Sequence, residues 1–187
     1  MKRCPVLTLL ALFTLTLAAP PGLAFERVGD KKILVFAGRQ EVPTIDPSVK
    51  YDWSIRMMQQ GLYDALVKYV GNPPEIVPWL AERWEASPDA RTWTFHLTKN
   101  ARFHNGDPVT AEAVRWSFAR TLKLNQGPAW MLSDFLKEDG IKLVNEHTIQ
   151  FVLSQPYSPF LSFVAWWYVM NPKQVLGNEQ GGDLGQK

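Results

Sequence analysis

Residues 78–97 read PWLAERWEASPDARTWTFHL, and residues 101–118 read ARFHNGDPVTAEAVRWSF. Polar and apolar side chains alternate strictly over the last six residues of the first run, TWTFHL. This period of two predicts a half-buried strand over residues 92–97, with Trp93, Phe95 and Leu97 facing the core. In the second run, Asn-Gly at residues 105–106 is typical of a tight turn, because both residues tolerate a positive φ.

A helix is predicted directly after this turn, over residues 111–124. The Thr110 hydroxyl can accept a hydrogen bond from the first free N–H groups, and Glu112 lies in the electropositive first turn. Apolar residues recur every three or four positions, which indicates one buried stripe. The stripe consists of Ala111, Val114, Phe118 and Leu122.

Towards the N-terminus, the apolar run at residues 32–37 predicts a buried first strand. A polar segment with two prolines follows it and cannot continue as a helix. Residues 52–66 predict a helix whose inner face carries Ile55, Met58, Leu62 and Leu66. Residues 66–70 then suggest a short strand that ends in the turn at residues 71–74.

Towards the C-terminus, residues 141–144 and 148–153 predict a hairpin, followed by a short helix over residues 158–164. Residues 166–170, WWYVM, read as an apolar strand, and we expect Trp166 and Trp167 to be buried in it. The Gly- and Gln-rich residues 177–187 predict an unanchored tail. The whole pattern indicates an α/β fold with a mixed sheet and flanking helices.

The first 24 residues have the pattern of a signal peptide. Lys2 and Arg3 precede an apolar run at residues 6–19, and small residues precede a predicted cleavage after Ala24. The apolar run is shorter than the roughly 20 residues that a membrane-spanning helix requires. The one cysteine, Cys4, precedes the run, so we expect no lipid anchor at the cleavage point and release into the periplasm as a soluble protein.

Charge and cysteine usage exclude several classes of function. Without residues 1–24 the chain would carry 18 basic and 18 acidic residues, and no cluster of basic residues indicates a nucleic-acid partner. The same part of the chain has no cysteine for a disulfide bond or a thiolate metal site.

The sequence contains no pattern typical of an enzyme or a cofactor site. The three histidines, His96, His104 and His147, do not have zinc-ligand spacing. His104 with Asp107 could form a base and its orienting carboxylate, but a histidine in a turn is the simpler interpretation. No nucleophile elbow, phosphate loop or dinucleotide fingerprint occurs. We therefore expect no catalytic residues, no metal and no cofactor.

The order of motifs over residues 78–118 resembles the family 5 extracellular solute-binding proteins, which serve peptide, nickel and related importers. The family order is a Leu-Ala-x-x-Trp helix, here at residues 80–84, then a Thr-Trp-Thr-Phe strand, Phe-His-x-Gly-x-Pro, and Thr-Ala-x-x-Val opening a helix. Supporting motifs lie at residues 45–47, 61–66 and 156–161. The family usually has glycine where Ala90 and Asn100 stand; we expect Ala90 in a type I turn and Asn100 in the left-handed region.

The resemblance implies a periplasmic-binding-protein type II-like fold, with residues 25–176 forming the N-terminal part of its first lobe. It implies capture of a peptide or other small-molecule ligand without chemistry, and delivery to an inner-membrane ABC permease. Nickel, opine or other small-solute binding remains an alternative within the family. A secreted hydrolase subdomain and a truncated remnant without function are alternatives from other classes.

The same resemblance points to candidate ligand contacts. Glu41 and Val42 belong to the segment that borders the cleft in peptide binders, and a surface loop is the alternative. Tyr51 and Trp130 match aromatic cleft positions of the nickel-binding branch, where Trp130 could instead fill the core. Tyr168 stands where that branch has a cleft arginine, which argues against chelated nickel as the ligand.

Family members are about three times as long as this chain, which we expect to end before the second lobe. The 187-residue chain alone should therefore bind weakly or not at all, and it should expose an unpaired sheet edge.

Overall fold

The computed structural model describes residues 25–28, 30–34, 41–180 and 185. The predicted signal peptide, the end of the predicted first strand at residues 35–37, and most of the predicted tail lie outside the described residues. The chain divides into two units, at residues 1–39 and 40–187, and each is taken by itself. In the first unit, β1 (Phe25–Val28) pairs antiparallel with β2 (Lys31–Leu34).

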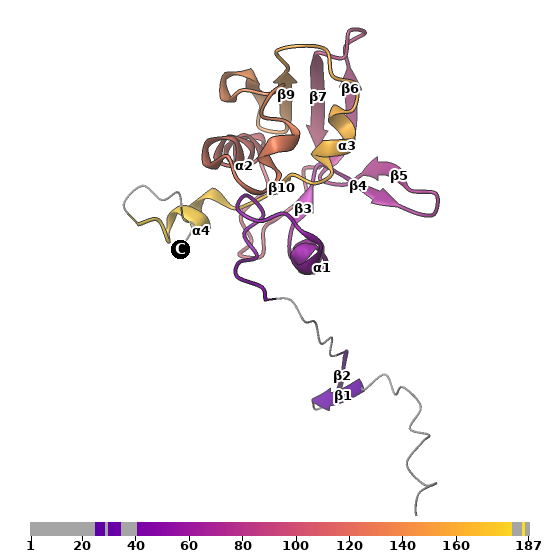
Figure 1. The fold of residues 1–187 in the computed structure, drawn as a ribbon, viewed down its shortest axis with the longest axis vertical. Coiled ribbons are helices and arrows are strands. Elements are labelled where there is room, and N and C mark those ends of the chain that lie inside the picture. The colour runs from indigo at the N-terminus through magenta and orange to yellow at the C-terminus, as the bar shows by residue number, and fades with distance from the viewer. Residues whose placement is uncertain (1–24, 29, 35–40, 181–184, 186–187) are drawn as a thin grey trace, which may run out of the picture. The chain divides into compact units, whose positions relative to one another are not determined.

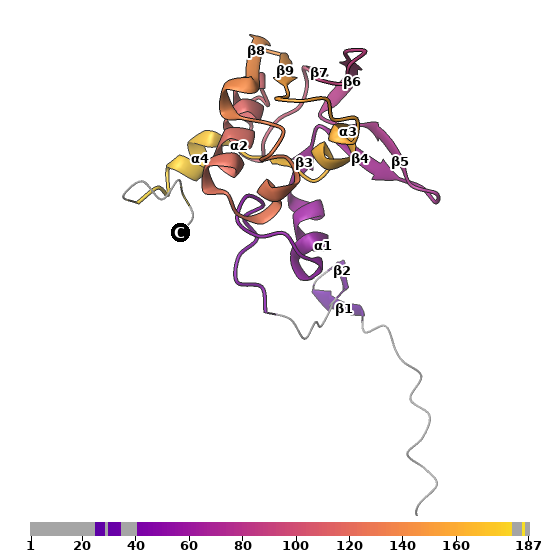
Figure 2. The ribbon, with the colours of Figure 1, turned by 45° about the horizontal axis from the view of Figure 1, so that its top comes forward.

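The second unit is built on a four-stranded sheet with the strand order β6-β7-β9-β8 (Figures 1 and 2). Its strands are β6 (Ala81–Ala86), β7 (Thr92–Leu97), β8 (Ile141–Asn145) and β9 (Thr148–Val152). The α/β class with flanking helices is confirmed. The sheet is antiparallel throughout rather than mixed, because short hairpin loops join β6 to β7 and β8 to β9.

The predicted alternation of β7 places its apolar side chains under two helices. Trp93, Phe95 and Leu97 are buried, as predicted. The ring of Phe118, from α2 (Ala111–Leu124), lies 4.8 Å from that of Phe151 on β9. The ring of Phe160, from α3 (Phe160–Val164), lies 5.5 Å from the Phe151 ring as well. The two helices therefore share one face of the sheet and form one core with it.

The predicted helix at residues 111–124 is confirmed at both ends as α2. The Thr110 hydroxyl accepts a hydrogen bond from the Ala113 N–H at 3.3 Å, and Asn125 ends the helix in the left-handed conformation. Ala111, Val114 and Phe118 are buried, whereas Leu122 is half-buried.

Two other predicted helices need correction. The Leu-Ala-x-x-Trp segment at residues 80–84, expected to be helical, instead leads into the edge strand β6, which pairs with β7 along most of its length. The helix α1 is Trp53–Leu62 rather than residues 52–66, and Asp52 caps it. Its buried residues are Ile55 and Gln59. Ile55 and Leu66 of the predicted apolar stripe are buried, the latter beyond the end of the helix, whereas Met58 and Leu62 are exposed.

The chain after α1 turns into strands. Gly61 weakens the end of the helix, and Asp64 and Ala65 form β3 (Asp64–Ala65) against β10 (Tyr168–Val169). The predicted apolar strand at residues 166–170 is thus only two residues long. Trp167 is buried as expected, but Trp166 is half-exposed, because the chain turns there after α3.

The remaining elements surround the sheet. A hairpin of β4 (Val67–Val70) and β5 (Glu75–Pro78) extends from the body of the second unit, as Figures 1 and 2 show. Short helices complete the unit, namely η1 (Gly127–Met131), η2 (Glu138–Gly140) and α4 (Pro172–Leu176). Within the described part of the chain, none of the helices reaches the length and apolar character needed to cross a bilayer.

Ala90 ends the turn at residues 87–90 in the left-handed conformation, with φ of 53°, which favours the glycine that the family usually has there. Its N–H donates to the Ser87 carbonyl, and its own carbonyl accepts from the Trp93 indole and the Tyr157 N–H. These hydrogen bonds hold the turn in place. Asn100, by contrast, is not among the described residues with positive φ.

We predict that Ala90→Gly raises the free energy of unfolding by about 1 kcal/mol. A left-handed conformation costs a residue with a Cβ atom roughly 1–2 kcal/mol, and part of this gain is offset by the greater freedom of glycine in the unfolded chain. Urea unfolding followed by tryptophan fluorescence measures the change. The control is Ala86→Gly, at an exposed position of β6, where the same substitution should lower the free energy of unfolding. If Ala90→Gly lowered the free energy of unfolding as much as Ala86→Gly does, the prediction would be wrong.

Candidate ligand-binding surface

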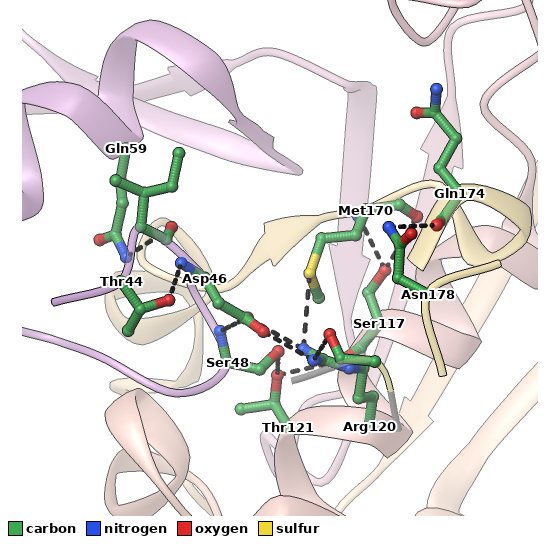
Figure 3. Close-up of polar contacts among 12 residues, drawn as sticks. Thr44, Asp46, Ser48, Gln59, Ser117, Arg120, Thr121, Met170, Gln174 and Asn178 are labelled. Atoms are coloured by element: carbon green, nitrogen blue, oxygen red, sulfur yellow. Dashed lines mark hydrogen bonds and ion pairs between the residues drawn. The ribbon is translucent and has the colours of Figure 1, made fainter. Parts of the chain in front are cut away.

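A buried ion pair holds the segment around Asp46 against α2. The Arg120 guanidinium donates to both carboxylate oxygens of Asp46, at 2.9 and 2.6 Å (Figure 3). The side chain of Arg120 is 1% exposed and that of Asp46 is 16% exposed. A charge-assisted pair with two parallel hydrogen bonds fixes both position and orientation. The Asp46 segment is therefore held at one place on α2.

Further hydrogen bonds fix the same segment on either side of Asp46. The Ser48 hydroxyl lies 2.6 Å from that of Thr121 on α2. The side-chain amide of Gln59 donates to the carbonyls of Ile45 and Lys50. A buried glutamine in α1 thus connects two carbonyl groups of the loop that precedes this helix.

The segment around β10 is fixed to the same helix. The Met170 N–H donates to the Ser117 hydroxyl at 2.9 Å, and this hydroxyl donates to the Ala113 carbonyl at 2.7 Å. The sulfur of Met170 lies 3.8 Å from an Arg120 nitrogen. One helix therefore positions two of the segments that carry predicted ligand contacts, the one around Asp46 and the one next to Tyr168 (Figure 3).

Two of the predicted contact residues, Tyr51 and Trp130, lie side by side. Their ring centroids are 6.4 Å apart in an edge-to-face arrangement, and the Phe163 ring lies 6.4 Å from Trp130. Trp130 is 64% exposed, which excludes the alternative that it fills the core. Trp130 of η1, Tyr51 just before the N-cap of α1, and Phe163 of α3 together form what we call the aromatic wall, in which Trp130 is exposed and the other two rings are half-buried.

Tyr168, a third predicted residue, lines a groove of about 280 Å³, which we call the aromatic groove. Its ring lies 6.1 Å from that of Tyr63, and burial raises the pKa of both phenols above their ordinary value. Both are protonated at neutral pH and can donate a hydrogen bond. The other lining residues are Gln60, Asp64, Ala65, Val67, Lys68, Tyr69, Trp79, Ala165 and Trp166.

The remaining predicted residues, Glu41 and Val42, are exposed and precede the fastened part of their segment. They do not line the aromatic groove, and the structure does not bring them together with Tyr168 in it.

Sequence reasoning missed three residues of this surface. Trp166 was expected inside the core, yet it stacks on Tyr69 with centroids 5.6 Å apart and lines the aromatic groove. Tyr63 was assigned to a helix. Arg56 belongs to no motif, although its four-residue spacing from Gln60 on one helix could have drawn attention to it.

The His104 and Asp107 interpretation as a base and its orienting carboxylate finds no support. His104 is exposed. The side-chain amides of Asn171 and Asn105 donate to Asp107, and these bonds lower the pKa of its carboxyl group. Asp107 thus joins the turn to the start of α4. The described residues contain no group of histidine, cysteine or acidic side chains that could hold a metal ion.

Comparison with known proteins gives the family context of this surface. The profile of the bacterial extracellular solute-binding proteins, family 5 Middle, matches residues 75–184, more than half of the chain. The chain is 41% identical over 139 residues to the probable D,D-dipeptide-binding periplasmic protein DdpA of Escherichia coli, covering 72% of this chain and 26% of that protein. It is 36% identical over 108 residues to the nickel-binding periplasmic protein of the same bacterium, covering 57% of this chain and 20% of that protein.

Among solved structures, the chain is similar to the binding protein AgaA from A. tumefaciens R10, solved in complex with agropinic acid. The TM-score is 0.66 at 31% sequence identity, and the match covers 76% of this chain and 29% of AgaA. The chain therefore spans about a quarter of the length of the relatives that it matches.

We predict that Asp46→Asn lowers the free energy of unfolding by about 3 kcal/mol, because it removes the carboxylate charge that meets the buried Arg120 guanidinium with two hydrogen bonds. Urea unfolding measures this loss. The matched control is Glu112→Gln, which breaks the exposed ion pair with Arg115 and should cost less than about 0.5 kcal/mol. Similar losses in the two variants would show that the Asp46 pair does not fasten the segment.

Proposed function

Because the chain belongs to the family 5 bacterial extracellular solute-binding proteins, we propose that it is part of the substrate-binding component of an ABC importer that captures peptides in the periplasm. The family is one of binding proteins, defined by solute capture rather than by catalysis. Among its relatives, the 41% identity with a probable D,D-dipeptide-binding protein supports a peptide as the ligand.

The observation that carries this proposal is that the chain has two aromatic surfaces, the aromatic wall and the aromatic groove. Solute-binding sites are typically concave and lined by apolar and aromatic side chains, with a few polar groups that orient the ligand. Trp130 and Tyr51 offer apolar area, and the phenols of Tyr63 and Tyr168 offer hydrogen-bond donors. Aromatic contact tolerates different side chains, which suits a carrier of varied peptides.

Capture would then proceed without a covalent step. The peptide loses water against the aromatic wall, and its backbone groups form hydrogen bonds with the cleft, including the segment that contains Glu41 and Val42. In two-lobed binding proteins, closure of the second lobe over the ligand is the change that a transporter can recognise. The partner that receives the ligand would be an inner-membrane permease.

For export, we predict cleavage after Ala24, so the chain recovered from the periplasm of a Gram-negative host should begin at Phe25. N-terminal sequencing and intact mass measure this. The variant Ala24→Asp, which removes the small residue before the cleavage point, should keep the mass of the uncleaved chain. A full-length wild-type chain in the cytoplasm would contradict the proposed location.

For binding, we predict that the 187-residue chain binds the dipeptide Ala-Phe weakly, with a Kd of about 1 mM, because only one wall of the cleft contributes. Trp130→Ala should weaken binding about tenfold through the loss of one aromatic contact. Ligand-observed NMR with a titration measures both values. The control Val144→Ala truncates an exposed apolar residue of β8 and should leave the Kd unchanged.

Other outcomes of this experiment identify the alternatives. Saturable binding of a nickel chelate or of an opine, with none of the peptide, would assign the chain to another ligand class of the family. Hydrolysis of the peptide during the titration would indicate an enzyme. Absence of binding to all of these ligands would contradict the millimolar affinity that we predict for this chain.

A further inference from the structure

Arg56 lies between two tryptophans at the edge of the aromatic groove. Its guanidinium carbon lies 3.5 Å from the centroid of the Trp166 ring and 4.7 Å from that of Trp53. Trp53 and Arg56 come from α1, whereas Trp166 follows α3, so the arrangement depends on the tertiary fold. Stacking against ring faces holds the guanidinium plane in place and leaves the N–H groups at its edge available to a ligand.

The described residues provide no acidic partner for this charge. Their ion pairs involve Lys50, His96, Arg115, Arg120 and Lys173, and none involves Arg56. Nor do the described hydrogen bonds include its guanidinium, unlike those of Arg91 and Arg102, which donate to carbonyl groups. Arg56 is half-buried, so its five donors are oriented and partly shielded from water.

The position of Arg56 connects it to the aromatic groove. Gln60, one helical turn later on α1, lines both the aromatic groove and a shallow hollow formed with Trp53, Arg56 and Met57. Trp166 contacts Arg56 and also lines the aromatic groove. Gln60 and Trp166 thus connect the aromatic groove with Arg56, so a ligand that extends from the groove past these two side chains can contact the guanidinium.

The charge of the aromatic groove itself is already balanced. The carboxylate of Asp64 accepts a hydrogen bond from the indole N–H of Trp79. The Lys68 ammonium lies 3.0 Å from the centroid of the same indole ring. One negative and one positive charge thus accompany Trp79, and Arg56 adds an unbalanced positive charge at the edge.

We propose that Arg56 forms a carboxylate-binding subsite, in which its guanidinium donates two parallel hydrogen bonds to a carboxylate of the bound solute. The apolar part of the solute lies in the aromatic groove next to it. This inference rests on the proposed function and extends it to a ligand class: peptides, or other solutes, that present a carboxylate next to an apolar group.

The test compares three peptides with the 187-residue chain: Ala-Phe, which has a free terminal carboxylate; Ala-Phe-NH2, which has none; and Glu-Phe-NH2, which has a carboxylate only in its side chain. NMR titration should show that the wild-type chain binds Ala-Phe about tenfold more tightly than Ala-Phe-NH2. If Glu-Phe-NH2 binds as well as Ala-Phe, a side-chain carboxylate also reaches the subsite. If it binds only as well as Ala-Phe-NH2, the subsite accepts the terminal carboxylate alone.

Variants separate the charge of Arg56 from its packing. Arg56→Gln should abolish the preference for the carboxylate and leave the affinity for Ala-Phe-NH2 unchanged, whereas Arg56→Lys should retain part of the preference. The control Arg83→Gln removes the same charge from an exposed position on β6 and should retain the wild-type preference.

Three results would overturn the subsite. Equal affinity of the wild-type chain for Ala-Phe and Ala-Phe-NH2 would exclude it, while peptide capture would stand. Equal weakening of both peptides in Arg56→Gln would show that the arginine only supports the two tryptophans. Binding of neither peptide by the wild-type chain would contradict the proposed function together with the subsite.

Discussion

The buried ion pair between Asp46 and Arg120 is the constraint on which the arrangement of the binding surface depends. Removing a guanidinium from water is costly unless a carboxylate meets it with good geometry, and here two hydrogen bonds of 2.9 and 2.6 Å do so. Arg120 thereby fixes the loop that leads to Tyr51, and its neighbour Ser117 fixes the chain next to Tyr168. A helix of the core thus determines the distance between two parts of the surface.

The aromatic side chains of this protein fall into two groups, one buried in the core and one accessible at the surface. Phe95, Phe118, Phe151 and Phe160 are fully buried and join the helices to the sheet. Trp130, within the short helix η1, is exposed, and Trp166, in the turn after α3, is half-exposed. A large aromatic residue can remain exposed in a short, well-anchored connection because its hydrogen-bonded backbone fixes its position. The abundance of aromatic residues therefore reflects both a core and a surface suited to solutes.

The sequence predicted the parts of the fold in which neighbouring residues decide the structure. The alternation of residues 92–97 and the Thr110 cap were both confirmed, because strand period and helix capping act over a few residues. The prediction failed where distant segments compete with local preference. The Leu-Ala-x-x-Trp segment has helical spacing, yet its pairing with β7 makes it a strand. The end of the predicted first helix became β3 for the same reason, through its pairing with β10.

By itself, the sequence determined the family, the main strand and helix, and which residue types could meet a ligand, since these follow from motif order and periodicity. Only the tertiary structure decided which of those residues come together. It placed Tyr51 against Trp130, Tyr168 against Tyr63, and Arg56 against Trp166. The members of the last pair are more than a hundred residues apart in the chain, and no local pattern encodes such a contact. Their proximity follows from burying one shared core, which brings α1 and the connection after α3 to the same edge of the molecule.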